Sequence, residues 1–129
     1  MATSFANRLA EGEELGDDEE EFHLLARADM LNAALMGAVA FQKGLGVTHS
    51  WAHSLSTVCD LHHGLANAIM IPYCMKFNAQ AVPELLTDLA REVGALEASP
   101  DGFVSWLLSI NESLGLPTKL HEVGVKLEH

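Results

Sequence analysis

Residues 33–40 read Ala-Ala-Leu-Met-Gly-Ala-Val-Ala, an apolar stretch of mostly small side chains that decides the fold class. They form the second half of a longer pattern at residues 19–43, in which apolar side chains recur at the three- and four-residue spacing of an α-helix. A helix that is apolar on all sides is typical of the interior of a helical bundle. Gly44-Leu45-Gly46 follows and is expected to end this helix.

The remainder of the chain also has helical patterns. Further helices are expected at residues 49–57, 64–78, 83–96 and 103–114. Pro72 lies inside the second of these segments and is expected to kink or break it. No alternating strand pattern of useful length appears in the sequence, so the predicted fold class is all-α.

The composition is that of a globular protein, with 49% hydrophobic and 19% charged residues. The net charge of −11 argues against nucleic acid or an anionic membrane as a partner. Eight of the carboxylates lie at residues 11–21, and we interpret them as a solvated helix start because they lack the ligand spacing of a calcium loop. Residues 1–18 are therefore predicted to be an acidic lead-in, poorly ordered or partly helical, before a helical domain at residues 19–129.

The sequence also bears on the cellular location. It does not begin with a basic region followed by an apolar stretch, as a secretory signal would. The longest apolar runs, at residues 30–41 and 66–75, are shorter than the ~20 residues that span a bilayer. Cys59 and Cys74 are too few for a disulfide framework and are predicted to be reduced, buried thiols. We expect a soluble, cytoplasmic protein with no membrane partner.

Four of the seven histidines fall within fifteen residues, namely His49, His53, His62 and His63. Histidines at i and i+4 share one face of a helix, and neutral imidazole suits zinc, iron or nickel. Spacing alone favours His49 and His53 as metal ligands, joined by His62 or His63. Asp60 is the only acid nearby, so the spacing indicates an incomplete site whose other ligands lie outside the chain.

Three motifs together resemble the iron-containing alcohol dehydrogenase family. Residues 37–56 read GAVAFQKGLGVTHSWAHSLS and residues 60–73 read DLHHGLANAIMIPY, which reproduce the family's Gly-Leu-Gly, its His-x-x-x-His pair and its His-Gly step fourteen residues after the first histidine. Gly-Leu-Pro at residues 115–117, followed by Leu-x-x-x-Gly-Val at residues 120–125, resembles a later family signature. The resemblance covers about residues 9–125.

This resemblance implies a helical bundle like the C-terminal, dehydroquinate synthase-like domain of these enzymes, truncated here at one or both ends. It also replaces the ligand choice made from spacing. It implies that His49 and His63 are metal ligands, and that His53 lies beside the metal, near the nicotinamide and the substrate, where it helps to move a proton. The family's other two ligands, an Asp and a His, come from an earlier part of the helical domain, and an N-terminal α/β domain with a glycine-rich turn holds the cofactor.

The chain departs from the family at two positions. Family members often have Pro and Gly where this chain has Ser54 and Ser56. Replacement of the proline is mild, whereas a side chain at position 56 is expected to alter how closely backbone or cofactor can approach.

The function implied is part of an NAD(P)-dependent, metal-dependent alcohol dehydrogenase, with Fe²⁺ or Zn²⁺ and a small alcohol or carbonyl substrate. Since neither a Gly-x-Gly-x-x-Gly turn nor a strand to precede one occurs in the sequence, the isolated chain is expected to hold no dinucleotide, to bind metal weakly and to be inactive. The alternative is a non-catalytic helical binding or assembly module, or an inactive fragment of the enzyme. Truncation would expose an apolar face, so a homo-oligomer is expected.

Overall fold

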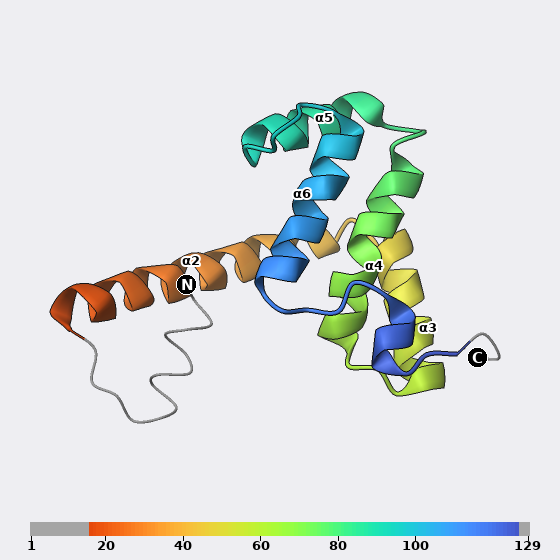
Figure 1. Ribbon diagram of the computed structural model, residues 1–129, viewed down its shortest axis with the longest axis horizontal. Helices are drawn as coiled ribbons and strands as arrows, with labels where there is room; N and C mark the ends of the chain where they lie inside the picture. Colours follow the sequence, from red (N-terminus) through yellow and green to blue (C-terminus); the bar gives the residue numbers. More distant parts are fainter. Residues whose placement is uncertain (1–15, 127–129) are drawn as a thin grey trace. The chain divides into compact units, whose positions relative to one another are not determined.

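The computed structural model describes residues 16–126, and within them every regular element is helical. The predicted all-α class is thereby confirmed. The helices are α2 (Asp17–Phe41), α3 (Val47–Cys59), α4 (His63–Asn78), α5 (Pro83–Glu92), α6 (Pro100–Ser113) and the short 3-10 helix η1 (Leu120–Val123) (Figure 1). Predictions for residues 1–15 and for the last three residues lie outside the described part.

The chain divides into two compact units, Met1–Gly44 and Leu45–His129. The described part of the first unit is helix α2 and the short segment after it. Its start is fixed by the Glu19 carboxylate, which accepts a hydrogen bond from the Gly16 N–H at 3.3 Å, and acidic side chains occupy the first turn where the helix dipole favours them. The helix ends two residues earlier than predicted, and Gly44 follows with φ 108°.

Helix α2 is also long and apolar enough to cross a membrane, judged by length and composition alone. It has 25 residues, and its most apolar 18-residue window has a mean hydropathy of 1.4. The apolar run noted in the sequence at residues 30–41 is shorter, because Arg27 and Asp29 interrupt the apolar part of this helix. Core helices of soluble proteins can have the same length and hydropathy, so these two properties of α2 do not identify where in the cell the protein lies.

In the second unit, α3 and α4 pack against each other and enclose one small core. Its buried members are Ala52, Leu55, Ala66, Met70 and Cys74. Cys59 is half-buried against this cluster, and no disulfide joins it to Cys74 among the described residues. Small side chains on the facing surfaces let the two helices approach closely, which fixes the position of the ends that carry the histidines.

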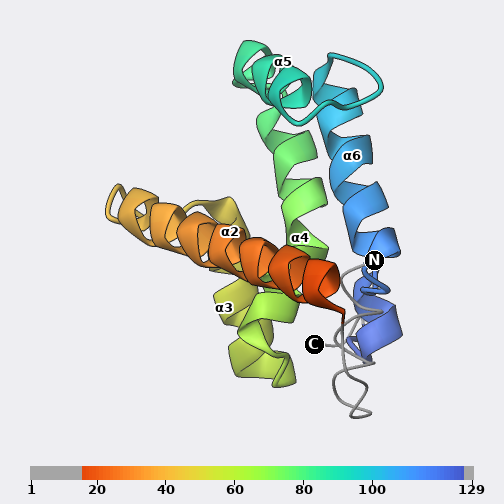
Figure 2. The same ribbon diagram turned by 90° about the vertical axis from the view of Figure 1, so that its left-hand side faces the viewer.

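Helix α4 runs side by side with α6, as both views show (Figures 1 and 2). The helix is continuous through Pro72, which is itself buried, so the predicted break does not occur. The side chain of Asn111, buried on α6, donates a hydrogen bond from Nδ2 to the Ala68 carbonyl of α4 at 2.7 Å.

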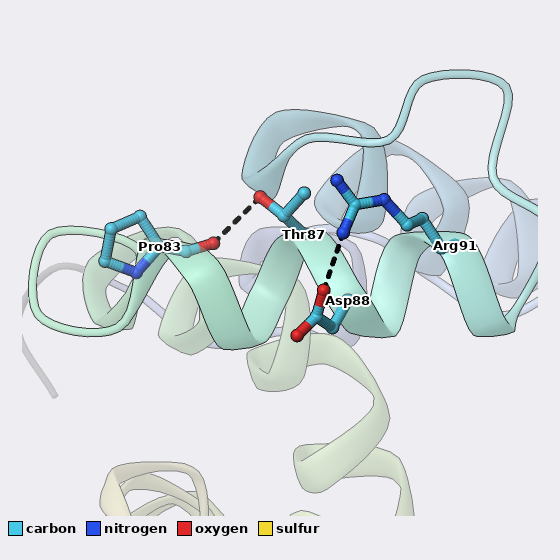
Figure 3. A network of polar contacts seen from close by, with 4 residues as sticks. All are labelled: Pro83, Thr87, Asp88 and Arg91. Carbon is cyan, nitrogen blue, oxygen red and sulfur yellow. Dashed lines mark hydrogen bonds and ion pairs between the residues drawn. The ribbon is translucent and has the colours of Figure 1, made fainter.

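Helices α5 and α6 enclose a second core of Leu86, Ala90 and Phe103, where the Phe103 and Trp106 rings stack 6.0 Å apart. On the outer face of α5, Thr87 donates to the Pro83 carbonyl and Arg91 pairs with Asp88 at 2.6 Å (Figure 3). Both members of this ion pair are exposed, so it contributes at most about 1 kcal/mol. The helix ends at Glu92, short of the predicted 96, because the chain turns at Gly94 with φ 67°.

Candidate metal centre

His49 and His53 lie on α3, which begins at Val47 directly after Gly46. His49 is in the first turn and His53 one turn further along, so both rings are on the same face of the helix. Their ring centroids are 6.4 Å apart. The face that carries them differs from the packing face of the same helix, which buries Ala52 and Leu55.

His63 reaches the same place from α4 through a tight turn. The connection is only three residues long, and Asp60 adopts the left-handed conformation there with φ 52°. The Leu61 N–H bonds back to the Leu55 carbonyl at 3.4 Å, which holds the turn against the end of α3. His63 is the first residue of α4, and its ring lies beside those of His49 and His53.

The three rings form a compact triangle at the junction of the two helices. The His63 centroid is 5.5 Å from that of His49 and 5.0 Å from that of His53. His49 is half-buried, whereas His53 and His63 are exposed to solvent. His62, the cap of α4, is exposed and makes no described ring contact with the three.

The imidazoles of this triangle have the donor chemistry that a divalent metal requires. Neutral imidazole nitrogen is a suitable donor for iron or zinc, and the His49 and His63 rings are near enough to act on one ion. No group of three or more His, Cys, Asp or Glu side chains within residues 16–126 is arranged to hold a metal ion. Within the described residues, the donors suited to a metal therefore amount to a pair of imidazoles and not to a complete ligand set. Asp60, the acid noted in the sequence, occupies the exposed cap of α3.

Two buried polar atoms lie on the same pair of helices. Ser56 Oγ and Asn67 Oδ1 are buried and find no hydrogen-bond partner within the described part of the chain. Ser56 stands where family members often have glycine, so its hydroxyl group occupies space that a glycine would leave empty. The amide nitrogen of Asn67 donates to the His63 carbonyl at 2.9 Å and so stabilises the first turn of α4.

Sequence reasoning assigned no role to Asn67, although it lies in the quoted stretch at residues 60–73. Its position four residues after His63 was the available signal, because an amide at i+4 can bond back to the carbonyl of residue i. Gly64 is also part of this turn. A Cβ atom on it would lie 3.3 Å from the His62 ring, a side chain that can move aside, so packing in the described chain does not by itself require glycine there.

A separate hollow lies between α4 and the C-terminal segment that contains η1. It has a volume of about 660 Å³, and its mostly apolar wall includes Met70, Tyr73, Leu120 and Val125. Tyr73 Oη donates to the Thr118 carbonyl at 2.8 Å and anchors the C-terminal segment beside it. None of the candidate site residues lines this hollow.

The described chain is an all-α domain in which three histidines lie together where α3 meets α4. Comparisons with known proteins identify its family. The profile described as "Fe-containing alcohol dehydrogenase family, C-terminal" matches residues 13–129. The chain belongs to the iron-containing alcohol dehydrogenase family, whose members are oxidoreductases, and represents its C-terminal helical part. The resemblance seen in the sequence is confirmed.

Several curated relatives show the same relationship. A 4-hydroxybutyrate dehydrogenase from Cupriavidus necator is 37% identical over an alignment of 107 residues, which covers 78% of this chain and 28% of the relative. A lactaldehyde reductase from Escherichia coli K12 is 36% identical over 91 residues, or 66% and 24% of the two chains. A 1,3-propanediol dehydrogenase from Klebsiella pneumoniae is 32% identical over 112 residues, or 81% and 29%. The match therefore spans less than a third of each of these relatives.

Proposed function

We propose that this chain is the metal-contributing helical part of an NAD(P)-dependent, metal-dependent alcohol dehydrogenase. His49 and His63 serve as two ligands of one divalent metal, Fe²⁺ or Zn²⁺, and His53 faces the substrate and the nicotinamide. The proposal is supported chiefly by the ring triangle, in which α3 and α4 bring three imidazoles within 5.0 to 6.4 Å of one another.

The roles of the three residues are taken from the family resemblance. When bound, the metal would act as a Lewis acid on the substrate oxygen, and the nicotinamide would exchange hydride with the carbinol carbon. His49 and His63 would fix the position of the ion from two different helices, each with one ring nitrogen. The His53 ring lies 5.0 Å from that of His63, so it would lie beside the proposed metal, where it could take or return the hydroxyl proton.

The substrate class follows from family membership. The named relatives act on a hydroxy acid, a hydroxyaldehyde and a diol, so we infer a small alcohol or carbonyl compound for the complete enzyme. We further infer that the other two ligands and the dinucleotide site lie outside this chain, that the isolated chain is inactive, and that the complete enzyme is cytoplasmic. A non-catalytic assembly module is the competing function.

The ligand assignment is tested by titrating the purified chain with Co²⁺ or Zn²⁺ and following the reaction by visible absorption and calorimetry. We expect weak binding with one ion per chain, and His49→Ala or His63→Ala should each weaken it about tenfold. His62→Ala is the matched control, since His62 is an adjacent exposed imidazole outside the triangle, and it should leave the affinity unchanged. Equal losses in all three variants would contradict the assignment.

The catalytic claim needs a second measurement. Alcohol-dependent reduction of NAD⁺ or NADP⁺ by the isolated chain with added Fe²⁺ or Zn²⁺ should be absent, and turnover would show that the site is complete without further ligands. A chimera in which residues of this chain replace the matching segment of the E. coli lactaldehyde reductase should reduce lactaldehyde. A chimera that folds and binds metal but shows no turnover would favour the assembly module.

A further inference from the structure

The first turn of α4 carries His63 but lacks the usual supports of a helix start. Its N-cap residue, His62, makes no side-chain hydrogen bond to the turn, and no acidic side chain lies there to complement the helix dipole. The second helical residue is Gly64, whose backbone loses more freedom on folding than that of any other residue type. Residues 62–64 are exposed, and the first buried residue of the helix is Ala66. The position of His63 therefore depends on bonds made within this turn.

The side chain of Asn67 supplies such a bond. Its Nδ2 atom donates to the His63 carbonyl at 2.9 Å, one turn back along the helix. Its Oδ1 atom is buried and finds no hydrogen-bond partner within the described part of the chain. Exchanging the two amide atoms would place one oxygen against another, so the turn selects the observed orientation of the amide.

His53 receives the same kind of bond on α3 but does not depend on it. Thr57 Oγ1 donates to the His53 carbonyl at 2.9 Å. His53 lies in the middle of its helix, between the buried residues Ala52 and Leu55. Its backbone is therefore fixed by helical turns on both sides and by packing. Loss of the bond from Thr57 should matter little, whereas loss of the bond at the start of α4 should release a histidine.

We propose that Asn67 is a positioning residue for the metal ligand His63. This role rests on the proposed function, in which His49 and His63 hold one ion. The bond to the His63 carbonyl keeps the first turn of α4 closed, so that the two rings stay 5.5 Å apart. A ligand pair binds an ion more weakly when one member must first be ordered, because part of the binding free energy is then used for that ordering.

The buried oxygen atom argues against a role for Asn67 as a ligand itself. Oδ1 is the atom of the amide that could donate to a metal, and it is buried, whereas the His63 ring is exposed to solvent. Iron and zinc also prefer imidazole, thiolate or carboxylate donors to an amide oxygen. Asn67 therefore acts on the metal through the position of His63.

Two substitutions of similar shape separate the bond from the bulk of the side chain. In Asn67→Thr a hydroxyl group can reach the same carbonyl, as Thr57 does on α3, whereas Asn67→Val has a methyl group in its place. Titration of the purified chain with Co²⁺, followed by visible absorption, should give an affinity about tenfold weaker for Asn67→Val and within about twofold of the natural chain for Asn67→Thr. Thr57→Val is the matched control and should also stay within about twofold. Equal affinities of the two Asn67 variants would overturn the proposal.

Hydrogen exchange of the metal-free chain reports on the turn itself. The Ala66 N–H donates to the His62 carbonyl at 2.9 Å and exchanges when the first turn opens. We expect its exchange to be about tenfold faster in Asn67→Val and within about twofold of the natural rate in Asn67→Thr. The amides of α6 serve as the internal reference, because global unfolding would speed their exchange as well. An unchanged rate at Ala66 in Asn67→Val would overturn the proposal.

The His63→Ala variant distinguishes failure of this role from failure of the proposed function. Weaker Co²⁺ binding in His63→Ala but not in Asn67→Val would overturn the positioning role and leave the ligand assignment intact. Unchanged binding in His63→Ala would overturn the ligand assignment, and the positioning role with it.

Discussion

Asn111 supplies the hydrogen bond that Pro72 removes from α4. The Ala68 carbonyl would accept from the N–H of residue 72 in an uninterrupted helix, but proline has no N–H. The Asn111 amide on α6 donates to that oxygen instead, at 2.7 Å. The proline is therefore accommodated by Asn111, which lies 43 residues beyond the carbonyl group that it satisfies, and the same bond joins α4 to α6.

This relationship predicts an unusual coupling between two substitutions. Asn111→Ala should destabilise the second unit by about 2 kcal/mol, because it leaves the Ala68 carbonyl without a donor. In a Pro72→Ala background the same change should cost less than about 1 kcal/mol, since the backbone N–H restored by that substitution donates to the carbonyl itself. Urea unfolding of the four proteins in the cycle measures both values. Additive effects would show that the bond does not compensate for the proline.

Gly102 should tolerate no side chain. A Cβ atom there would lie 1.9 Å from the Glu97 carbonyl oxygen, a backbone atom that cannot move aside cheaply. We expect Gly102→Ala to cost about 3 kcal/mol in urea unfolding. Gly37→Ala is the control, because a Cβ atom there meets nothing within 4 Å and alanine favours a helix by about 1 kcal/mol. A tolerated Gly102→Ala would mean that the loop before α6 can shift.

Ser56 should be replaceable with a gain in stability. Its hydroxyl is buried and lacks a partner among the described residues, so Ser56→Ala should stabilise the chain by about 1 kcal/mol. Ser54→Ala, on the same helix, removes a hydroxyl that donates to the Ser50 carbonyl at 3.1 Å on an exposed face, and should change stability by less than about 0.5 kcal/mol. Thermal unfolding followed by circular dichroism compares the two. Destabilisation by Ser56→Ala would indicate a partner for that hydroxyl.

His53 should affect turnover without affecting the metal. In the lactaldehyde reductase chimera, His53→Gln is expected to lower kcat by about a hundredfold, since a positioned proton-transfer group contributes roughly that much. Metal content, measured by atomic emission, should stay unchanged. His63→Ala in the same chimera should lower the metal content. Loss of metal in His53→Gln would instead make His53 a ligand.

Much of the fold could be predicted from local sequence, since each helix has its own apolar spacing and its own start and stop signals. The start of α5 at Pro83 and the cap of α6 at Ser99, which accepts from the Gly102 N–H at 3.0 Å, are both local signals. The continuity of α4 could not be predicted, because its cause, Asn111, is distant in sequence. Helix α5 ends earlier than predicted because of the backbone conformation of Gly94. The apolar spacing continues to residue 96 and therefore gave no sign of this end.

The residues of the candidate site could also be predicted only in part. Spacing placed His49 and His53 on one face, but it could not decide whether His62 or His63 joined them. The turn decides this: Asp60 takes a left-handed conformation, so His62 becomes the exposed cap and His63 the first helical residue. The buried oxygen of Asn67 could not be predicted, because its burial depends on the packing of α3 against α4.

On α3, one side of the helix carries the imidazoles of His49 and His53 and another carries the packed Ala52 and Leu55. Chemistry and scaffold are thus separable on this helix. An engineer could exchange its two imidazoles for a different donor set and keep the packed side chains unaltered. Natural divergence could adapt such a helix to another ion by the same route, at little cost to folding.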